Sequence, residues 1–221
     1  SSAASDVYKR QLYDLTSLQR DANRVLGYTS QQTLDYLQAL YEKKLCTYPR
    51  TDSRFLTEDM EDSISGLVSS AAAVCGVASP TTIHAKQVCN NKKVTDHHAL
   101  IVTGVVPEGL SEAEAVVYEM IAGRMLEAFS PRCEKESLKM ECVCEGMDFR
   151  SQSAVIVNPG WRAVFSRKED REKDEPEGNG GTAVFAEGEE IPVMGYGLAQ
   201  KKTLPRPLYT EATLLLSLIH I

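Results

Sequence analysis

The chain has 221 residues, of which 43% are hydrophobic and 25% are charged, and its formal net charge at pH 7 is −7. This length can bury one large core or two ordinary ones, and the composition is typical of globular proteins. The acidic balance argues against an indiscriminate nucleic-acid binder but leaves room for a local basic groove. We expect no membrane span, which takes roughly 20 apolar residues, and no signal peptide.

Six cysteines are spread through the sequence without C-x-x-C spacing, at positions 46, 75, 89, 133, 142 and 144. Cys142 and Cys144 alternate around Val143, as residues on one face of a strand do. Neither these cysteines nor the histidines have the spacing of a zinc site, so the sequence predicts no metal ligands. Free thiols are the ordinary state in a cytoplasm, which is where we place the protein.

The two ends of the chain are related through their codons. Residues 6–11, Asp-Val-Tyr-Lys-Arg-Gln, can be encoded by a string whose reverse complement encodes Leu-Ser-Leu-Ile-His-Ile, which are residues 216–221. Such a pair resembles a sequencing adapter translated at both ends. We therefore expect residues 1–11 and 216–221 to be adapter-derived, and residues 12–215 to be natural sequence from a longer chain. Other codons in the source DNA would contradict this.

Two amphipathic helices come next. The first is predicted over residues 12–26 and ends at Gly27, with an apolar stripe formed by Leu15, Leu18, Ala22, Val25 and Leu26. Thr29 and Gln32 then form a capping box for a helix over residues 30–44. Its inward face is formed by Leu34, Leu37, Tyr41 and Leu45. Helix, tight turn and helix are the outline of a helix-turn-helix module, with or without a wing.

Residues 45–53 contain a tyrosine, an arginine and an aspartate at alternating positions, Tyr48, Arg50 and Asp52. A phenol is only about one part in a thousand ionised at pH 7, and a neighbouring cation favours the ionised form. A guanidinium can also hold two oxygens of a phosphodiester at once. Tyr48 with Arg50 is therefore a candidate nucleophile with its phosphate clamp. The alternative is an ordinary turn in which Arg50 pairs with Asp52.

Two further helices are predicted around a second polar cluster. Thr57 caps a helix over residues 58–74, and Ser111 with Glu114 forms a capping box for a helix that ends near residue 129. Between them, His97 and His98 lie in a polar insert ahead of an apolar run. A cationic imidazole here could donate to a phosphate as a second clamp. The alternative is a surface pair without a function.

After Pro131 the apolar period changes from 3.6 to 2. Strands are predicted over residues 137–144, 149–157, 162–165 and 182–193, and the charged run 167–181 is predicted to be a solvated loop. Another helix is expected to begin at residues 209–213. The sequence therefore predicts an α+β chain with a domain boundary near residues 131–136, mainly helical before it and mainly β after it.

Several segments together resemble the type IA DNA topoisomerases, in particular the topoisomerase III-like branch. They are LQRDAN at residues 18–23, QALYE at 38–42, TYPRTDS at 47–53 and YTEATLL at 209–215. The run His97-His98-Ala99-Leu100 is similar to the histidine motif of that family, H-x-A-[IL]-x-P-T. The resemblance covers essentially all of residues 12–215.

This resemblance implies a role for each matching residue. Tyr48 would form a 5′-phosphotyrosyl bond with one DNA strand, and Arg50 would orient the scissile phosphate. His97 falls on the family's histidine, and Asp52 on the acid that orients it. The strand-binding groove would be lined by Gln38, Tyr41, Glu42, Arg54 and His98. Val102 stands where the family has proline, which could leave the backbone after His97 less fixed.

The resemblance also implies an architecture. Residues 12–134 would form a helical winged-helix (CAP-like) catalytic domain, residues 135–207 a β-rich arch that acts as the gate hinge, and residues 208–215 the start of a base domain. The full-length parent would use Mg²⁺ held by a domain outside this chain, act on single-stranded DNA without ATP, and work at the nucleoid. This chain alone would be inactive.

Two readings without catalysis remain open on the residues themselves. The helix-turn-helix could belong to a non-catalytic winged-helix DNA-binding module in which Tyr48 is incidental. Alternatively, the chain could be a structural interaction protein in which Arg50 and Asp52 merely stabilise a turn.

Overall fold

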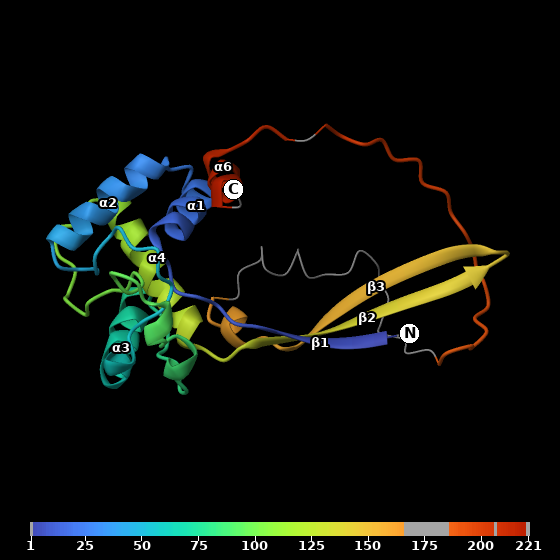
Figure 1. Cartoon of the computed structure of the whole chain (residues 1–221), viewed down its shortest axis with the longest axis horizontal. Helices are drawn as coiled ribbons and strands as arrows, with labels where there is room; N and C mark the ends of the chain where they lie inside the picture. The colour runs from blue at the N-terminus through green and yellow to red at the C-terminus, as the bar shows by residue number, and fades with distance from the viewer. Residues whose placement is uncertain (1, 166–185, 206, 220–221) are drawn as a thin grey trace.

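A computed structural model describes residues 2–165, 186–205 and 207–219. A helical body lies at one end of the molecule and a long three-stranded antiparallel sheet projects from it (Figure 1). The chain then returns along an extended path, and its last helix packs against the first one (Figure 1). The α+β class predicted from the sequence is confirmed.

The first two helices follow the predicted pattern closely. Helix α1 spans Leu15–Leu26 and α2 spans Ser30–Glu42, with Gly27 at φ 72° and a complete capping box at Thr29. Helix α1 begins three residues later than predicted, because Asp14 has an extended backbone and its carboxylate accepts from the Ser17 N–H at 2.7 Å. Two residues of the expected inward faces are exposed instead, Val25 at 55% and Tyr41 at 39%.

The predicted third helix is divided. Residues Glu58–Ser63 form the 3-10 helix η1, and α3 spans Ile64–Val74. Thr57 makes no side-chain cap bond, so its predicted capping role is wrong. The N–H of Glu58 donates instead to Oδ1 of Asn91 at 2.9 Å. Short 3-10 turns follow at Ala85–Gln87 (η2) and Asn91–Lys93 (η3).

Helix α4, Glu112–Phe129, is the centre of the helical body and begins at the predicted capping box of Ser111 and Glu114. Nearly every residue from Val117 to Phe129 is buried, and α4 packs against α1, α2 and α3. Helices that are apolar all round are buried on every side. The segments on which the candidate site depends therefore rest on a rigid central helix.

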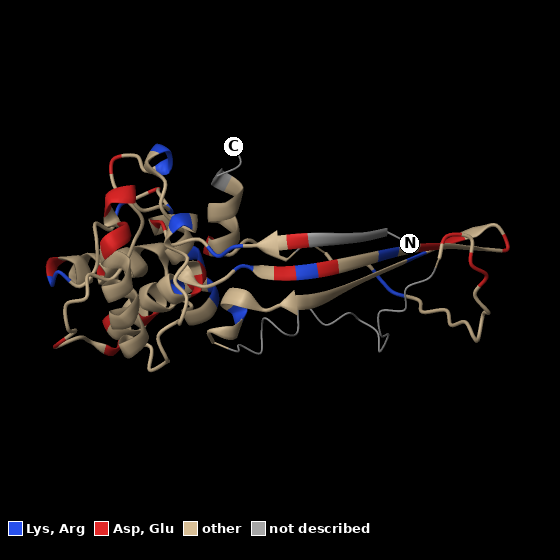
Figure 2. Ribbon diagram, turned by 90° about the horizontal axis from the view of Figure 1, so that it is seen from below, with Lys and Arg blue, Asp and Glu red and all other residues tan. Residues whose placement is uncertain are grey.

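The sheet has the order β1-β2-β3, with β1 at Ser2–Tyr8, β2 at Cys133–Cys144 and β3 at Met147–Asn158. Residues 2–8, predicted to be adapter-derived, pair with β2 from Ser2↔Lys139 to Tyr8↔Cys133. Acidic and basic residues are interspersed along the projecting sheet (Figure 2). The change from helix to strand falls between Phe129 and Cys133.

Two predicted strands are wrong. Residues 162–165 lie in and after the 3-10 helix η4, Gly160–Ala163, because the Trp161 N–H donates to Pro131 O at 2.9 Å and the indole N–H donates to Tyr8 O at 3.2 Å. Residues 186–193 form a turn and irregular chain, and Val193 is 67% exposed. Residues 182–185 and the predicted loop 167–181 lie outside the described residues.

The last helix, α6 at Glu211–Ile219, begins within the predicted helix start and packs against α1. One carboxylate oxygen of Glu211 accepts from both the N–H (2.6 Å) and the hydroxyl (3.0 Å) of Ser30, the first residue of α2. The Ala212 N–H donates to Asn23 at 3.3 Å. None of the helices in the described part of the chain has the length and apolarity needed to cross a membrane.

Candidate active site at the Tyr48 loop

Tyr48 lies just after a short antiparallel pairing between residues 45–47 and 101–103. The Thr47 N–H donates to Ile101 O and the Thr103 N–H donates to Leu45 O, both at 3.0 Å. The Thr47 hydroxyl donates to Ala99 O and accepts from the Ile101 N–H, each at 3.1 Å. This pairing brings Tyr48 next to the histidine segment, which is about fifty positions away in the sequence.

The ring of Tyr48 contacts two other rings. Its centroid is 4.2 Å from that of His97, with an interplanar angle of 34°, and 5.6 Å from that of Tyr41, which meets it edge-on at 85°. Tyr48 is half-buried, whereas Tyr41 and His97 are exposed. The structure therefore brings together three of the predicted site residues, one from α2, one from the loop and one from the histidine segment.

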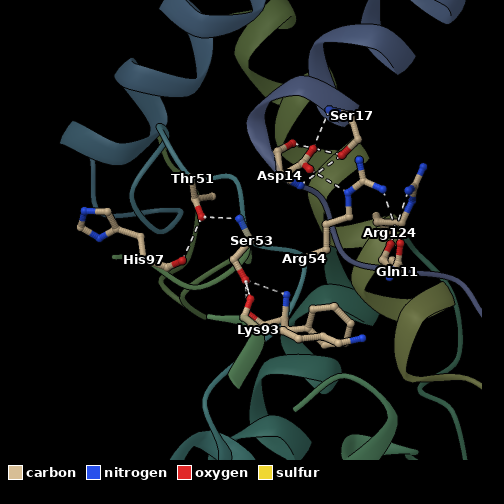
Figure 3. Close-up of polar contacts among 10 residues, drawn as sticks. Gln11, Asp14, Ser17, Thr51, Ser53, Arg54, Lys93, His97 and Arg124 are labelled. Carbon is tan, nitrogen blue, oxygen red and sulfur yellow. Dashed lines mark hydrogen bonds and ion pairs between the residues drawn. The ribbon is translucent and has the colours of Figure 1, made fainter. Parts of the chain in front are cut away.

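Arg50 and Arg54 have different surroundings. Arg50 is exposed, and no hydrogen bond or ion pair joins it to any described residue. Arg54 donates from Nε to Asp14 at 2.7 Å and from a terminal nitrogen to Gln11 at 3.4 Å. Figure 3 shows Arg54 reaching toward Asp14 and away from His97. Arg50 is thus available to an anion beside Tyr48, and the Arg54 guanidinium is occupied at the start of α1.

Asp52 contacts a different partner from the one that the resemblance implied. Its carboxylate accepts from the Thr95 hydroxyl at 2.6 Å, and no hydrogen bond joins it to the His97 ring among the described residues. His97 itself is bonded by Thr51, whose hydroxyl donates to the backbone oxygen of His97 at 3.0 Å (Figure 3). Asp52 therefore reaches the histidine segment but not the imidazole.

The backbone that follows His97 is held at every N–H from residue 99 to residue 103. The N–H groups of residues 99 and 100 donate to Phe55 O and Tyr13 O, both at 2.9 Å. Those of residues 101 and 103 donate to the segment 45–47, which precedes Tyr48. The Val102 N–H donates to the sulfur of Met125 at 3.1 Å. The expected loosening at Val102 is not found, because valine keeps an N–H that proline lacks.

The remaining predicted groove residues, Gln38, Glu42 and His98, contact neighbours on their own segments. Gln38 donates to Glu42 at 3.1 Å on α2, and the ring nitrogen Nδ1 of His98 is 2.9 Å from Ala99 O. A hollow of about 480 Å³ adjoins the Tyr48 loop, lined by Tyr41, Glu42, Lys44, Cys46, Thr47 and Thr103. Glu42 and Tyr41 thus face one hollow, while His98 lies on the histidine segment.

Other nucleophiles nearby are suppressed by burial. Burial raises the pKa of the Cys46 thiol to about 12, so the thiolate is absent at neutral pH. Burial also raises the pKa of Tyr13, whose hydroxyl donates to Asp21 at 2.9 Å. The Tyr48 phenol, in contrast, is half-buried, and Arg50, two residues later, has no hydrogen-bond or ion-pair partner among the described residues.

The described residues contain no cluster of three or more His, Cys, Asp or Glu side chains placed to hold a metal ion. The acids of η1 are a solvated helix face: Glu58, Asp59 and Asp62 are exposed. The donor set of the described residues therefore does not fit a resident Mg²⁺.

Four residues that fix the site were not singled out from the sequence: Thr47, Thr51, Ser53 and Thr95. Their hydroxyls bond to residues 40 to 54 positions away. Threonine and serine at alternating or adjacent positions beside Tyr48 were visible in the sequence, but no local pattern names a partner at that separation. Only the fold identifies them as ties between the two segments.

Comparisons with known proteins identify the family. A family model described as DNA topoisomerase matches residues 1–220. The chain is 35% identical over 213 residues to DNA topoisomerase 3 of Bacillus subtilis and 36% identical over 213 residues to that of Bacillus licheniformis, covering 92% of this chain in each case. It spans 29% of the length of both relatives.

A solved structure shares the fold. Full-length topoisomerase I from Thermotoga maritima superimposes with a TM-score of 0.66 at 21% identity, over 99% of this chain and 36% of that one. Because the family model matches nearly the whole sequence, this chain belongs to the type IA DNA topoisomerase family.

Proposed function

We propose that this chain carries the nucleophile-bearing part of a type IA topoisomerase that cleaves and religates one DNA strand. The observation that carries the proposal is the Tyr48 phenol, whose ring contacts those of Tyr41 and His97, with Arg50 two residues away and without a hydrogen-bond or ion-pair partner among the described residues. A fixed donor at a position where charge develops is worth a hundredfold or more in rate.

The reaction consists of two transesterifications. The phenolic oxygen of Tyr48 attacks phosphorus, the bond from phosphorus to the 3′-oxygen breaks, and the phenolic proton is lost while the departing 3′-oxygen takes up a proton. The 5′-phosphate is then an ester of Tyr48. In the reverse step the 3′-hydroxyl attacks the same phosphorus and restores the phenol, so the bond energy is conserved and no ATP is consumed.

The ring contact restricts where the phosphate can lie. A centroid separation of 4.2 Å between Tyr48 and His97 leaves no room for a phosphate between the two rings. The phosphate must therefore approach the edge of Tyr48 that carries the hydroxyl, where Arg50 can bind the non-bridging oxygens. An imidazole donating to the same oxygens would be a second clamp, and His97 is exposed in a position to do so.

We extend the proposal to the architecture and the partners. Residues 12–134 would be the winged-helix-like catalytic domain, residues 135–207 the arch that serves as gate hinge, and residues 208–215 the start of a base domain. The substrate would be single-stranded DNA, and Mg²⁺ would be held by other segments of the parent. The relatives' names, DNA topoisomerase 3, support a DNA substrate and an isomerase activity.

The decisive experiment traps the covalent adduct in a protein that carries these residues together with the rest of the relatives' length. A DNA oligonucleotide is labelled at its 3′ end in one reaction and at its 5′ end in another, and the reaction is stopped with denaturant. We expect the 3′ label to remain on the protein and the 5′ label to leave with a free 3′-hydroxyl. Tyr48→Phe should abolish the adduct, and the control Tyr196→Phe, at a fully exposed position outside the site, should retain it.

Persistence of the adduct in Tyr48→Phe, or retention of the 5′ label, would contradict the proposal. For the 221-residue chain by itself we expect weak binding of single-stranded DNA and no cleavage. Relaxation of supercoiled plasmid by this chain alone would contradict this expectation, because it would show that the rest of the relatives' length is not needed for cleavage.

A further inference from the structure

Three consecutive side chains next to the Tyr48 loop reach across to the histidine segment. The Ser53 hydroxyl donates to Lys93 O at 2.9 Å, the Asp52 carboxylate accepts from the Thr95 hydroxyl at 2.6 Å, and the Thr51 hydroxyl donates to His97 O at 3.0 Å. Residues 51, 52 and 53 thus bond to residues 97, 95 and 93, so the two segments run antiparallel to each other.

These ties and the pairing at residues 45–47 enclose the reactive residues. Thr47 is bonded to the segment 99–101 on one side, and Thr51 is bonded to His97 on the other. Tyr48, Pro49 and Arg50 are the three positions between them, and no hydrogen bond ties these three to another described residue. The nucleophile and its guanidinium are thus carried on a span fixed at both ends.

The imidazole of His97 has no hydrogen-bond partner among the described residues. Its position depends on its own backbone and on the contact with the Tyr48 ring. The backbone is set by the Thr51 bond to the carbonyl of His97 and, two residues earlier, by the Asp52 bond to Thr95. A displacement of about 1 Å in a reacting geometry can cost a hundredfold in rate.

We propose that Thr95 and Thr51 are positioning residues that hold His97 against Tyr48, and that Asp52 acts through the Thr95 hydroxyl rather than on the imidazole. The effect on DNA cleavage rests on the function proposed above, whereas the effect on the position of the rings does not. Thr95 is exposed and Thr51 is buried, so Thr95 can be altered with little risk to folding.

The first test measures position without DNA. The 221-residue chain has four histidines, so its imidazole proton resonances can be assigned by NMR with the aid of His97→Gln. The Tyr48 ring shifts the His97 resonances through its ring current, and Tyr48→Leu gives the value without that ring. We expect Thr95→Val to remove most of the shift and Thr95→Ser to keep it. Thr82→Val, at an exposed position outside the site, is the matched control.

The second test measures adduct formation in a protein of the relatives' full length. We expect Thr95→Val and Thr51→Val to slow it by about 10- to 100-fold, and Thr95→Ser to restore it to within about threefold. Asp52→Asn keeps an oxygen that can accept from Thr95, so it should retain more activity than Asp52→Ala. Equal loss in both Asp52 variants would mean that the negative charge itself is required, which would overturn the proposal.

The outcomes separate the two hypotheses. An unchanged His97 shift in Thr95→Val contradicts the positioning role, whatever the activity. A changed shift with an unchanged adduct rate contradicts the catalytic consequence. A Tyr48→Phe variant that still forms the adduct would contradict the proposed function, but it would not affect the NMR result on the position of His97.

Discussion

Two arginines four positions apart show how much a side chain's role depends on its partners. Arg54 is tied to Asp14, and Asp14 also caps α1, so that guanidinium stabilises the start of a helix. Arg50 is exposed and unpaired among the described residues. The same residue type therefore contributes to folding at one position and is available to a substrate at the other.

This contrast predicts opposite effects for two matched substitutions. Arg50→Ala should slow adduct formation in the full-length parent by about a hundredfold or more because a phosphate clamp is lost, with no change in the melting temperature of this chain. Arg54→Ala should lower the free energy of unfolding by about 1 kcal/mol, since its ion pair is partly exposed. Calorimetry and adduct trapping measure the two effects.

Arg50→Lys refines the first prediction. A lysine keeps the charge but loses the planar fork, so the rate should fall between those of the parent and Arg50→Ala. A lysine variant as fast as the parent would mean that only the charge matters, and an unchanged rate in Arg50→Ala would remove Arg50 from the site.

At the scale of elements, the start of α1 is joined to α4 by a buried polar cluster. The Arg124 guanidinium lies over the Tyr13 ring, 3.8 Å from its centroid, and forms hydrogen bonds with the Tyr13 hydroxyl and with Asp21. Burial by itself would raise the pKa of Asp21, but the Arg124 charge and the Tyr13 hydroxyl outweigh it and hold that pKa below its ordinary value. The ion pair between Arg124 and Asp21 exists only while Asp21 is ionised.

A pH dependence of stability follows. With a folded-state pKa below 3.8, Asp21 stabilises the fold fully above its unfolded-state pKa, and this contribution disappears as pH falls through the folded value. Asp21→Asn should therefore cost about 2 kcal/mol at neutral pH, and this cost should be smaller at about pH 3, below the ordinary pKa of the carboxyl. Urea unfolding at both pH values tests this, with the exposed Asp62→Asn as control. An equal cost at both pH values would contradict it.

The elements that were predicted correctly are those whose signals are local. The capping boxes at Thr29 and Ser111 each join residues three positions apart, and both are formed. The Thr57 cap failed because the Glu58 N–H donates instead to Asn91, thirty-three positions away from Glu58. The strand predicted at 162–165 failed because Trp161 is bound to Pro131 and Tyr8.

The residues of the site likewise divide into those that a local sequence signal identifies and those that only the fold identifies. The sequence motif identified Tyr48, Arg50 and His97, and the structure places Tyr48 and His97 in ring contact. Neither the Thr95 partner of Asp52 nor the outward position of Tyr41 could be read from it, because both depend on how α2 and the histidine segment meet. Helical periodicity placed Tyr41 inward, but the ring of Tyr48 supplies its contact instead.

At the scale of the whole molecule, the chain leaves the helical body as a sheet and returns to it as α6 (Figure 1). The return is fixed by Glu211, whose carboxylate lies at the N-terminus of α2 and accepts two hydrogen bonds from Ser30. A negative charge at this end of a helix is favourable. Glu211 therefore joins the last helix to α2, while Ala212 and the packing against α1 join it to the first helix.

Glu211→Ala should release this contact. We expect faster hydrogen exchange of the α6 amides and a loss of about 1 kcal/mol in the free energy that holds α6 on the body. Exchange in α4 should be unchanged, since its residues are buried independently of α6. Glu190→Ala, at an exposed position before the return, is the control. Unchanged exchange in α6 would show that its apolar contacts with α1 suffice.

The projecting sheet has a mechanical consequence. Strand β2 has 12 residues, which at about 3.3 Å per residue gives an arm of about 40 Å. Its base is held tightly, with Cys133 fully buried and Gly160 so close to Arg132 O that an added Cβ would lie 2.1 Å from that oxygen. If the base of the sheet rotated by about 10°, an arm of that length would move by about 7 Å at its tip.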